Sequence, residues 1–246
     1  MKHVFRYVVG SEPREGQALS LGDADSHHLA RVVRRRPGDE VEVIAPSGDL
    51  WPCRVVDAGP PSVVEVAGPA RPGPRVRPVH LRVGLCEPGR LDLVAEKAAE
   101  LGATSLEVVV TSRARRVPDG GAWQKRTDRM ARVAESAARQ SGRGTWPAPG
   151  ALVPFGHVLT EIVPEQGVIL DPRAATPLAE VIRARPPHDP LTILVGPDTG
   201  FSDDEMTAAH RRGLASASLG EGMLRTETAA IAACALALAC DARGNR

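Results

Sequence analysis

From Val79 onward, short apolar strands alternate with helical segments, and this alternation constrains the fold more than any other feature of the sequence. The first four segments are VHLRVGLC (79–86), GRLDLVAEKAAELG (89–102), SLEVVVT (105–111) and WQKRTDRMARVAESAARQSG (123–142). They predict strand, helix, strand and helix. The rhythm continues through GVILD, PLAEVIRAR, LTILVG, a helix after Phe201, ASASLG and a helix from about Arg225. Strands separated by helices form a mostly parallel sheet covered on both faces, so we expect an α/β domain.

The chain before this domain has a β-type pattern. DEVEVIA (39–45) and WPCRVVDAG (51–59) alternate apolar and polar residues around a Ser-Gly-Asp turn, which predicts a hairpin. Proline and glycine then accumulate in AGPARPGPRVRP (67–78), which can form neither a helix nor a central strand. We therefore expect a small β-rich domain at 1–70, a linker at 71–78 and the α/β domain at 79–246.

The composition indicates a globular protein. Hydrophobic residues make up 42% of the 246 residues, enough for a sizeable core. The longest apolar stretch, 229–240, is shorter than the roughly 18 to 20 residues that a membrane span needs. We expect a cytoplasmic protein with no membrane partner. The four cysteines are scattered without a C-x-x-C pair or a histidine cluster, so we interpret them as buried thiols and expect no metal.

Positive charge is concentrated in two places although the net charge is only +1. Residues 111–143 hold nine basic and three acidic side chains, and a second cluster contains Arg31, Arg34, Arg35 and Arg36. Two basic clusters favour RNA or DNA as a partner. The alternative is a solvated helix face.

Two glycine-containing loops follow predicted strands. Gly196-Pro197-Asp198-Thr199-Gly200 precedes a helix whose start carries a capping box, Ser202 with Glu205. Gly220 and Gly222 precede the last helix. Neither loop matches the dinucleotide or P-loop motif. Both loops could line one cofactor pocket, or they could simply mark the starts of helices.

The polar residues before the last helix are unusual, because the rest of that helix is apolar. Burying Arg225 or Glu227 without a partner would be costly, so the two should face each other or a ligand. The alternative is that Thr226 caps the helix, Glu227 interacts with the helix dipole and Arg225 is a surface residue.

Several motifs resemble one family. GPDTGFSDDE followed by SLGEGMLRTETAAIAA resembles the C-terminal signature of the RsmE family, bacterial methyltransferases that modify N3 of a uridine in 16S (small-subunit) ribosomal RNA. EKAAELGATSLEVVVTSRA, AARQSGRGTWPAPG and ILDPRA are similar to other family segments, and HHLARVVRRRPGDEVEVIAPSGDLW resembles its N-terminal PUA-like barrel. The motifs occur in the family's order and cover nearly the whole chain.

The resemblance implies a SPOUT-type parallel sheet with a C-terminal trefoil knot, preceded by a small PUA-like β-barrel domain that binds RNA. It also implies S-adenosyl-L-methionine as cofactor, a homodimer, and 16S rRNA or the small ribosomal subunit as partner. The implied cofactor-binding residues are Leu170, Leu194, Gly196, Pro197, Gly200, Leu219, Gly220, Met223 and Leu224.

The remaining implied roles concern catalysis and RNA. Arg225 would stabilise the developing uridinate oxygen, and Glu227 would either help to remove the N3 proton or orient Arg225. Gln140 and Arg143 would position the target nucleotide or its phosphate. In the barrel domain the expected phosphate contacts are Arg31, Arg34 and Arg36.

The sequence departs from the family pattern at two places. In the loop that usually reads G-P-E-G-G, this chain has Asp198 in place of the glutamate and Thr199 in place of the first glycine after it. Thr199 is β-branched and would be strained if this position needs a positive φ. In the turn before Arg90, which usually reads K-G-[DE], this chain has Glu87-Pro88-Gly89. Two alternatives to the uridine-N3 enzyme therefore stay open. One is a non-catalytic RNA-binding or ribosome-assembly paralogue, and the other is a knotted methyltransferase acting on a different RNA position or on the ribose. The intact segment 224–228 favours the active enzyme.

Overall fold

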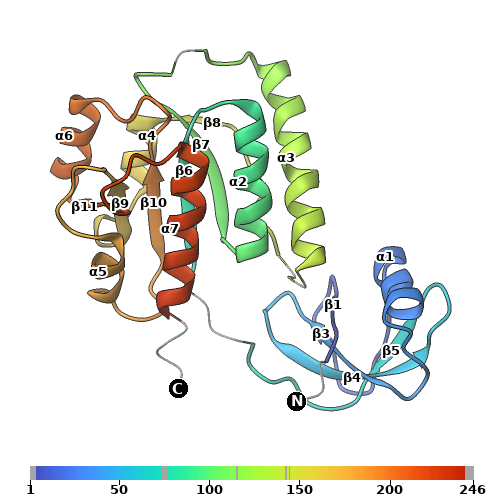
Figure 1. Ribbon diagram of the computed structural model, residues 1–246. Coiled ribbons are helices and arrows are strands. Elements are labelled where there is room, and N and C mark those ends of the chain that lie inside the picture. The colour runs from blue at the N-terminus through green and yellow to red at the C-terminus, as the bar shows by residue number, and fades with distance from the viewer. Residues whose placement is uncertain (1–3, 74–76, 115, 142, 144, 242–246) are drawn as a thin grey trace. The chain divides into compact units, whose positions relative to one another are not determined.

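The computed structural model describes residues 4–73, 77–114, 116–141, 143 and 145–241 (Figure 1). The chain divides into two compact units, Met1–Arg75 with Gly142–Gly144, and Val76–Ser141 with Thr145–Arg246. The expected linker at 71–78 includes residues 74–76, which lie outside the described residues.

The first unit is built on a five-stranded sheet in the order β1-β3-β4-β5-β2. Its strands are β1 (Arg6–Val8), β2 (Ala18–Ser20), β3 (Glu40–Ile44), β4 (Leu50–Asp57) and β5 (Val63–Val66). The predicted hairpin is confirmed, because β3 and β4 pair antiparallel with Glu40 opposite Arg54. A helical segment that the sequence did not predict, α1 (Asp23–His27) continued by the π-helical turn η1 (His28–Val32), places Leu29 in the core beside Tyr7 and Val43.

The second unit contains a six-stranded sheet in the order β11-β9-β10-β6-β7-β8, and every adjacent pair is parallel. The strands are β6 (Val79–Gly84), β7 (Ser105–Val110), β8 (Leu152–Pro154), β9 (Gly167–Leu170), β10 (Leu191–Val195) and β11 (Ala215–Ala217). The predicted α/β domain with a parallel sheet is confirmed. The short edge strand β8 was not predicted.

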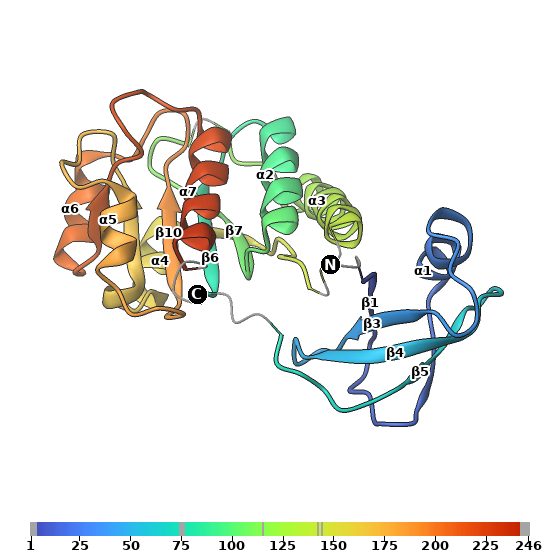
Figure 2. The same ribbon diagram turned by 60° about the horizontal axis from the view of Figure 1, so that its bottom comes forward.

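Helices cover both faces of this sheet. The helices are α2 (Pro88–Leu101), α3 (Gly120–Gln140), α4 (Phe155–Glu161), α5 (Leu178–Arg183), α6 (Asp203–Arg211) and α7 (Thr226–Asp241), with a 3₁₀ turn, η2, at Pro164–Gln166. Side chains of α2, α3, α5 and α7 share one core cluster, and those of α4 and α6 share another. Figure 2 shows α7, α2 and α3 following one another in a row. Ile193 and Leu194 of β10 belong to the two different clusters, as the pleat requires.

Because the strands are parallel, the segments that follow β6 and β10 leave the sheet at the same edge. Gly84 ends β6, and a Cβ atom there would lie 2.4 Å from the backbone nitrogen of Pro197. Only glycine therefore lets the loop after β10 lie directly against the end of β6.

The cysteine expectation is partly wrong. All four cysteines are free, but only Cys53 and Cys234 are buried, whereas Cys86 and Cys240 are partly exposed. In the described part of the chain no helix is both long enough and apolar enough to cross a membrane.

Candidate active site

A cavity of 310 Å³ lies where the segments after β9, β10 and β11 meet at the carboxyl edge of the sheet. Its volume is within the range of about 300 to 1,000 Å³ that small-molecule pockets occupy. Eight of the nine residues implied for cofactor binding line it: Leu170, Gly196, Pro197, Gly200, Leu219, Gly220, Met223 and Leu224. Met223 is 83% exposed. The ninth residue, Leu194, lies outside this lining and is fully buried against Phe201 and Val109 on the other face of the sheet.

The glycine loop after β10 has a close-fitting backbone. A Cβ atom on Gly196 would lie 3.3 Å from the Cα atom of Gly200 and 3.4 Å from the ring of Phe201. Gly200 has a φ of 69°, which only glycine adopts readily. Among the described residues other than glycine, positive φ occurs at Arg34 and His188 and not at Thr199. The departure at Thr199 therefore carries no backbone strain.

The predicted capping box fixes the end of this loop. Ser202 Oγ accepts from the Glu205 backbone N–H, and Glu205 Oε2 accepts from the Ser202 N–H at 2.8 Å. The other Glu205 oxygen accepts from the backbone N–H of Ser112 at 2.7 Å, beyond the end of β7. The start of α6 is thus attached to the neighbouring loop as well as to its own cap.

Thr226 connects the loop to the last helix. Its side chain is buried, and its hydroxyl lies within hydrogen-bond distance of the Gly196 carbonyl oxygen (3.1 Å) and of Asp198 Oδ1 (3.2 Å). One interpretation of the sequence was that the Thr226 side chain caps the last helix. In the structure the hydroxyl instead binds a loop about thirty residues earlier in the chain.

Arg90, near the start of α2, brings three carboxylates together. Its Nη1 donates to Asp198 Oδ1 at 2.6 Å, and its Nε lies 3.2 Å from Glu87 Oε2 and 3.8 Å from Glu227 Oε2. Sequence reasoning did not select Arg90, because nothing in the spacing of these residues indicates that they meet. The shared feature is that each lies in a segment at the carboxyl edge of the sheet.

The two proposed catalytic residues are placed differently. Arg225 is exposed, whereas the Glu227 side chain is only 12% exposed. Among the described residues, the cation next to Glu227 is Arg90 and not Arg225. Arg225 is therefore open to solvent and to a ligand at the start of α7.

Cys86 lies between β6 and α2 in the same region. Burial raises the pKa of its thiol to about 12, and the carboxylates of Asp198 and Glu227 contribute to the increase. The thiol is consequently neutral and a weak nucleophile near pH 7.

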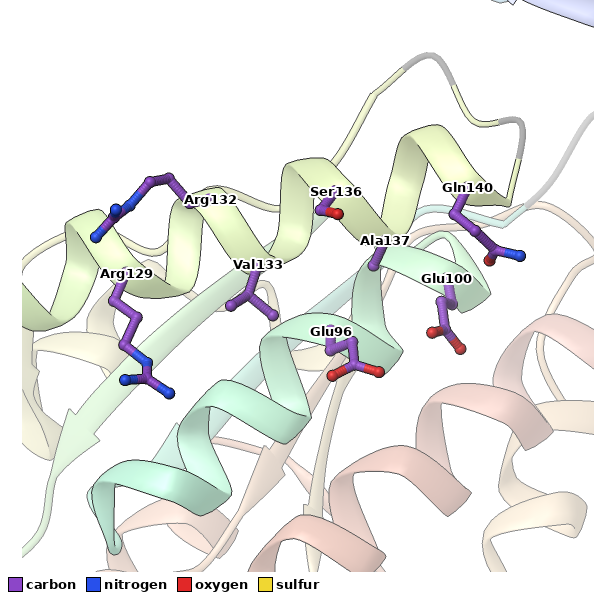
Figure 3. Close-up of a pocket in the computed structure, with 8 residues that line it drawn as sticks. All are labelled: Glu96, Glu100, Arg129, Arg132, Val133, Ser136, Ala137 and Gln140. Carbon is purple, nitrogen blue, oxygen red and sulfur yellow. The ribbon is translucent and has the colours of Figure 1, made fainter. Parts of the chain in front are cut away.

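Gln140, implied for RNA contact, does not line the cavity. Gln140 lines a groove between α2 and α3 with Glu96, Glu100, Arg129 and Arg132 (Figure 3). It lies at the end of α3, so it is about 30 Å along the helix axis from the helix start. Arg143 follows this helix.

The three arginines implied for phosphate contact belong to the first unit. Arg31 is in η1, and Arg34 and Arg36 are in the turn before β3; all three are exposed. Their position leaves their charges accessible to a polyanion.

Known proteins resemble this chain over most of its length. The family described as RNA methyltransferase domain matches residues 73–238, and the RNA methyltransferase PUA domain matches residues 21–66. Ribosomal RNA small subunit methyltransferase E of Synechocystis sp. is 28% identical over 231 residues, which are 92% of this chain and 74% of that protein. The Mycobacterium bovis protein of the same name is 28% identical over 233 residues, 92% of this chain and 88% of its own. A crystal structure of the Neisseria gonorrhoeae protein of that name, bound to S-adenosyl methionine, has a TM-score of 0.74 and 26% identity and covers 95% of this chain and 96% of its own.

Proposed function

Because this chain belongs to the RNA methyltransferase family, with a SPOUT methyltransferase domain and a PUA domain, we propose that it methylates N3 of a uridine in 16S ribosomal RNA. S-adenosylmethionine is the methyl donor. The observation that supports the proposal most is that eight residues from three separate segments, singled out by their resemblance to RsmE proteins, line one cavity. The named relatives, which are methyltransferases of small-subunit ribosomal RNA, support the substrate.

The cavity suits this cofactor. Leu170, Leu219 and Leu224 provide apolar surface for an adenosine group. Gly196 and Gly200 also line the cavity, and neither adds a side chain that would fill it. We therefore assign cofactor contact to the eight lining residues and a supporting role to Leu194, which packs behind them.

When bound, S-adenosylmethionine supplies a methyl group carried on a positively charged sulfur. Uracil N3 carries a proton, so it must lose this proton before its lone pair can form a bond to the methyl carbon. We propose that Glu227 accepts the proton or orients Arg225, and that the guanidinium of Arg225 stabilises the negative charge on the uracil oxygen. The ion pair between Arg90 and Glu227 holds the carboxylate at the start of α7.

The RNA is proposed to contact both units. The exposed side chains of Arg31, Arg34 and Arg36 would bind backbone phosphates, which gives affinity without sequence choice. Gln140 lies far along α3 from the helix start, so we propose that Gln140 and Arg143 position RNA at the site of the second chain in a homodimer. The boundaries 1–70, 71–78 and 79–246 remain our proposed domain limits.

We also propose the trefoil knot for the C-terminal segment. After the edge strand β11, the chain turns back so that α7 packs against α5, α2 and the central strands β6 and β10. Ser218 pairs with Pro177 on the way. Since ribosomal RNA is the proposed substrate, the reaction would take place in the cytoplasm.

Two measurements test the function. Titration calorimetry with S-adenosylhomocysteine should give micromolar affinity, about 8 kcal/mol. Incubation with labelled S-adenosylmethionine and either 16S rRNA or small ribosomal subunits, followed by nucleoside analysis, should give 3-methyluridine. A 2′-O-methylated nucleoside would support the enzyme for another position, whereas RNA binding without cofactor binding would support the non-catalytic paralogue.

A further inference from the structure

A second cavity of 590 Å³ adjoins the first one. The two cavities share Arg113 and the loop residues Pro197, Asp198 and Thr199. The other walls come from the turn between β6 and α2 and from the beginning of α3. The loop at 197–199 therefore borders both the proposed cofactor cavity and this larger neighbour.

The lining of the second cavity combines apolar and cationic groups. Leu85 supplies partly exposed apolar surface and Trp123, which is 8% exposed, a small part of its ring, and three guanidinium groups accompany them, those of Arg113, Arg116 and Arg126. Trp123 is held in place because its indole N–H donates to the carbonyl oxygen of Gly150 at 3.0 Å. This pairing of an aromatic surface with cations is what nucleotide sites use for the base and the phosphate.

The acids in this lining do not cancel the positive charge. Glu87 and Asp198 also line the cavity, but both pair with Arg90. Arg126 contacts Asp92 at 3.4 Å, and Asp92 also binds Arg129 at 2.8 Å, so the acidic groups around the cavity already have cationic partners.

We propose that the second cavity is the subsite for the RNA nucleotide that is methylated, with its base against Leu85 and the exposed part of Trp123 and its phosphates at Arg113 and Arg116. This inference rests on the proposed function. It places the nucleotide beside the cofactor cavity, at the 197–199 loop that lines both cavities, and methyl transfer requires the two reactants to be adjacent. A base that is extruded from its helix needs a pocket with a surface of this kind.

Two further features fit this assignment. Arg113 donates to the Thr199 carbonyl oxygen at 2.9 Å, so the cation that would contact phosphate also holds the loop that lines both cavities. Cys86 lines the cavity, and its protonated thiol does not compete with uracil N3 for the methyl group.

The first test uses uridine 5′-monophosphate as the probe with protein saturated by S-adenosylhomocysteine. The NMR signal of the Trp123 indole N–H, assigned with Trp123→Phe, should shift on titration, and the Trp51 signal should not. Inorganic phosphate should not reproduce the shift; if it does, the base-binding part of the proposal is wrong. Absence of any Trp123 response while S-adenosylhomocysteine binds would refute the subsite alone, and failure of S-adenosylhomocysteine to bind would instead refute the proposed function.

The second test measures methylation of 16S rRNA by Arg116→Ala. Arg116 is exposed, so its removal should leave the fold and the affinity for S-adenosylhomocysteine unchanged. We expect KM for the RNA to rise about tenfold, as for loss of a charge-assisted phosphate contact, with a much smaller change in kcat. Arg183→Ala is the matched control, because it removes an exposed positive charge from α5, whose residues line neither cavity, and should change KM less than Arg116→Ala does. Equal effects of the two substitutions would contradict a specific subsite.

Discussion

Replacing Thr226 by valine should weaken cofactor binding. The substitution keeps the shape of the side chain and removes the hydroxyl that reaches the Gly196 carbonyl oxygen at 3.1 Å and Asp198 Oδ1 at 3.2 Å. Thr226 is 3% exposed, so water cannot easily replace the lost donor. Leaving a buried acceptor without its donor costs about 1 to 3 kcal/mol. If that free energy is needed to hold the glycine loop in its binding conformation, the affinity for S-adenosylhomocysteine falls by about 5- to 150-fold.

The assay is titration calorimetry of S-adenosylhomocysteine with the wild type, Thr226→Val and Thr226→Ser. Serine keeps the hydroxyl and loses only a methyl group, so its affinity should stay within about threefold of the wild type. Thermal unfolding without ligand gives a second reading, since 1 kcal/mol corresponds to about 2 to 4 °C in a domain of this size. Wild-type affinity in Thr226→Val would refute the reasoning. Equal loss in Thr226→Ser would show that the methyl group, and not the hydroxyl, matters.

Three further outcomes are expected. Glu227→Gln should lower kcat by about 10²- to 10⁴-fold if Glu227 is the general base, while binding of S-adenosylhomocysteine persists; undiminished methylation eliminates that role. Gly84→Ala should destabilise the protein by about 1 to 3 kcal/mol and weaken S-adenosylhomocysteine binding, because the alanine Cβ would lie 2.4 Å from the Pro197 nitrogen. An unchanged melting temperature together with an unchanged affinity would contradict this packing. The pKa of the Cys86 thiol is about 12 in the folded protein and has its ordinary value of 9.0 in the unfolded chain, so at pH 8 the folded protein holds much less thiolate. Because the thiolate is the form that reacts, alkylation of Cys86 by iodoacetamide at pH 8 should be about 1,000-fold slower in the native than in the unfolded protein. Mass spectrometry of the digested protein measures this rate, and a native rate equal to the unfolded one would show that the thiol is not shielded.

The parallel sheet could be predicted because its strands and helices have different apolar periods. The helix at 89–102, for example, carries its own stop signal, and Gly102 adopts a left-handed φ of 94° where α2 ends. The edge strand β8 has three residues and ends at Pro154, so it has too few positions to show an alternation. The length and the apolar periodicity of each element therefore determined whether it could be predicted from the sequence.

The position of Leu194 shows a second limit of prediction from the sequence, namely that it does not give the face of a buried strand on which a side chain lies. All five residues of β10 are buried, and in such a strand both faces are apolar. Ile193 and Leu194 therefore look equivalent in the sequence although their side chains enter different core clusters. A motif that places a residue in a strand beside a cavity does not say to which face its side chain points.

Arg90 changes the meaning of the departures from the family pattern. In the sequence, Glu87 and Asp198 are two unrelated substitutions, and each suggests a weakened site. In the structure both carboxylates bind the guanidinium of Arg90, at 3.2 Å and 2.6 Å, and the same guanidinium faces Glu227 at 3.8 Å. The two departures therefore belong to one ion-pair network that joins the start of α2 to the glycine loop and to α7.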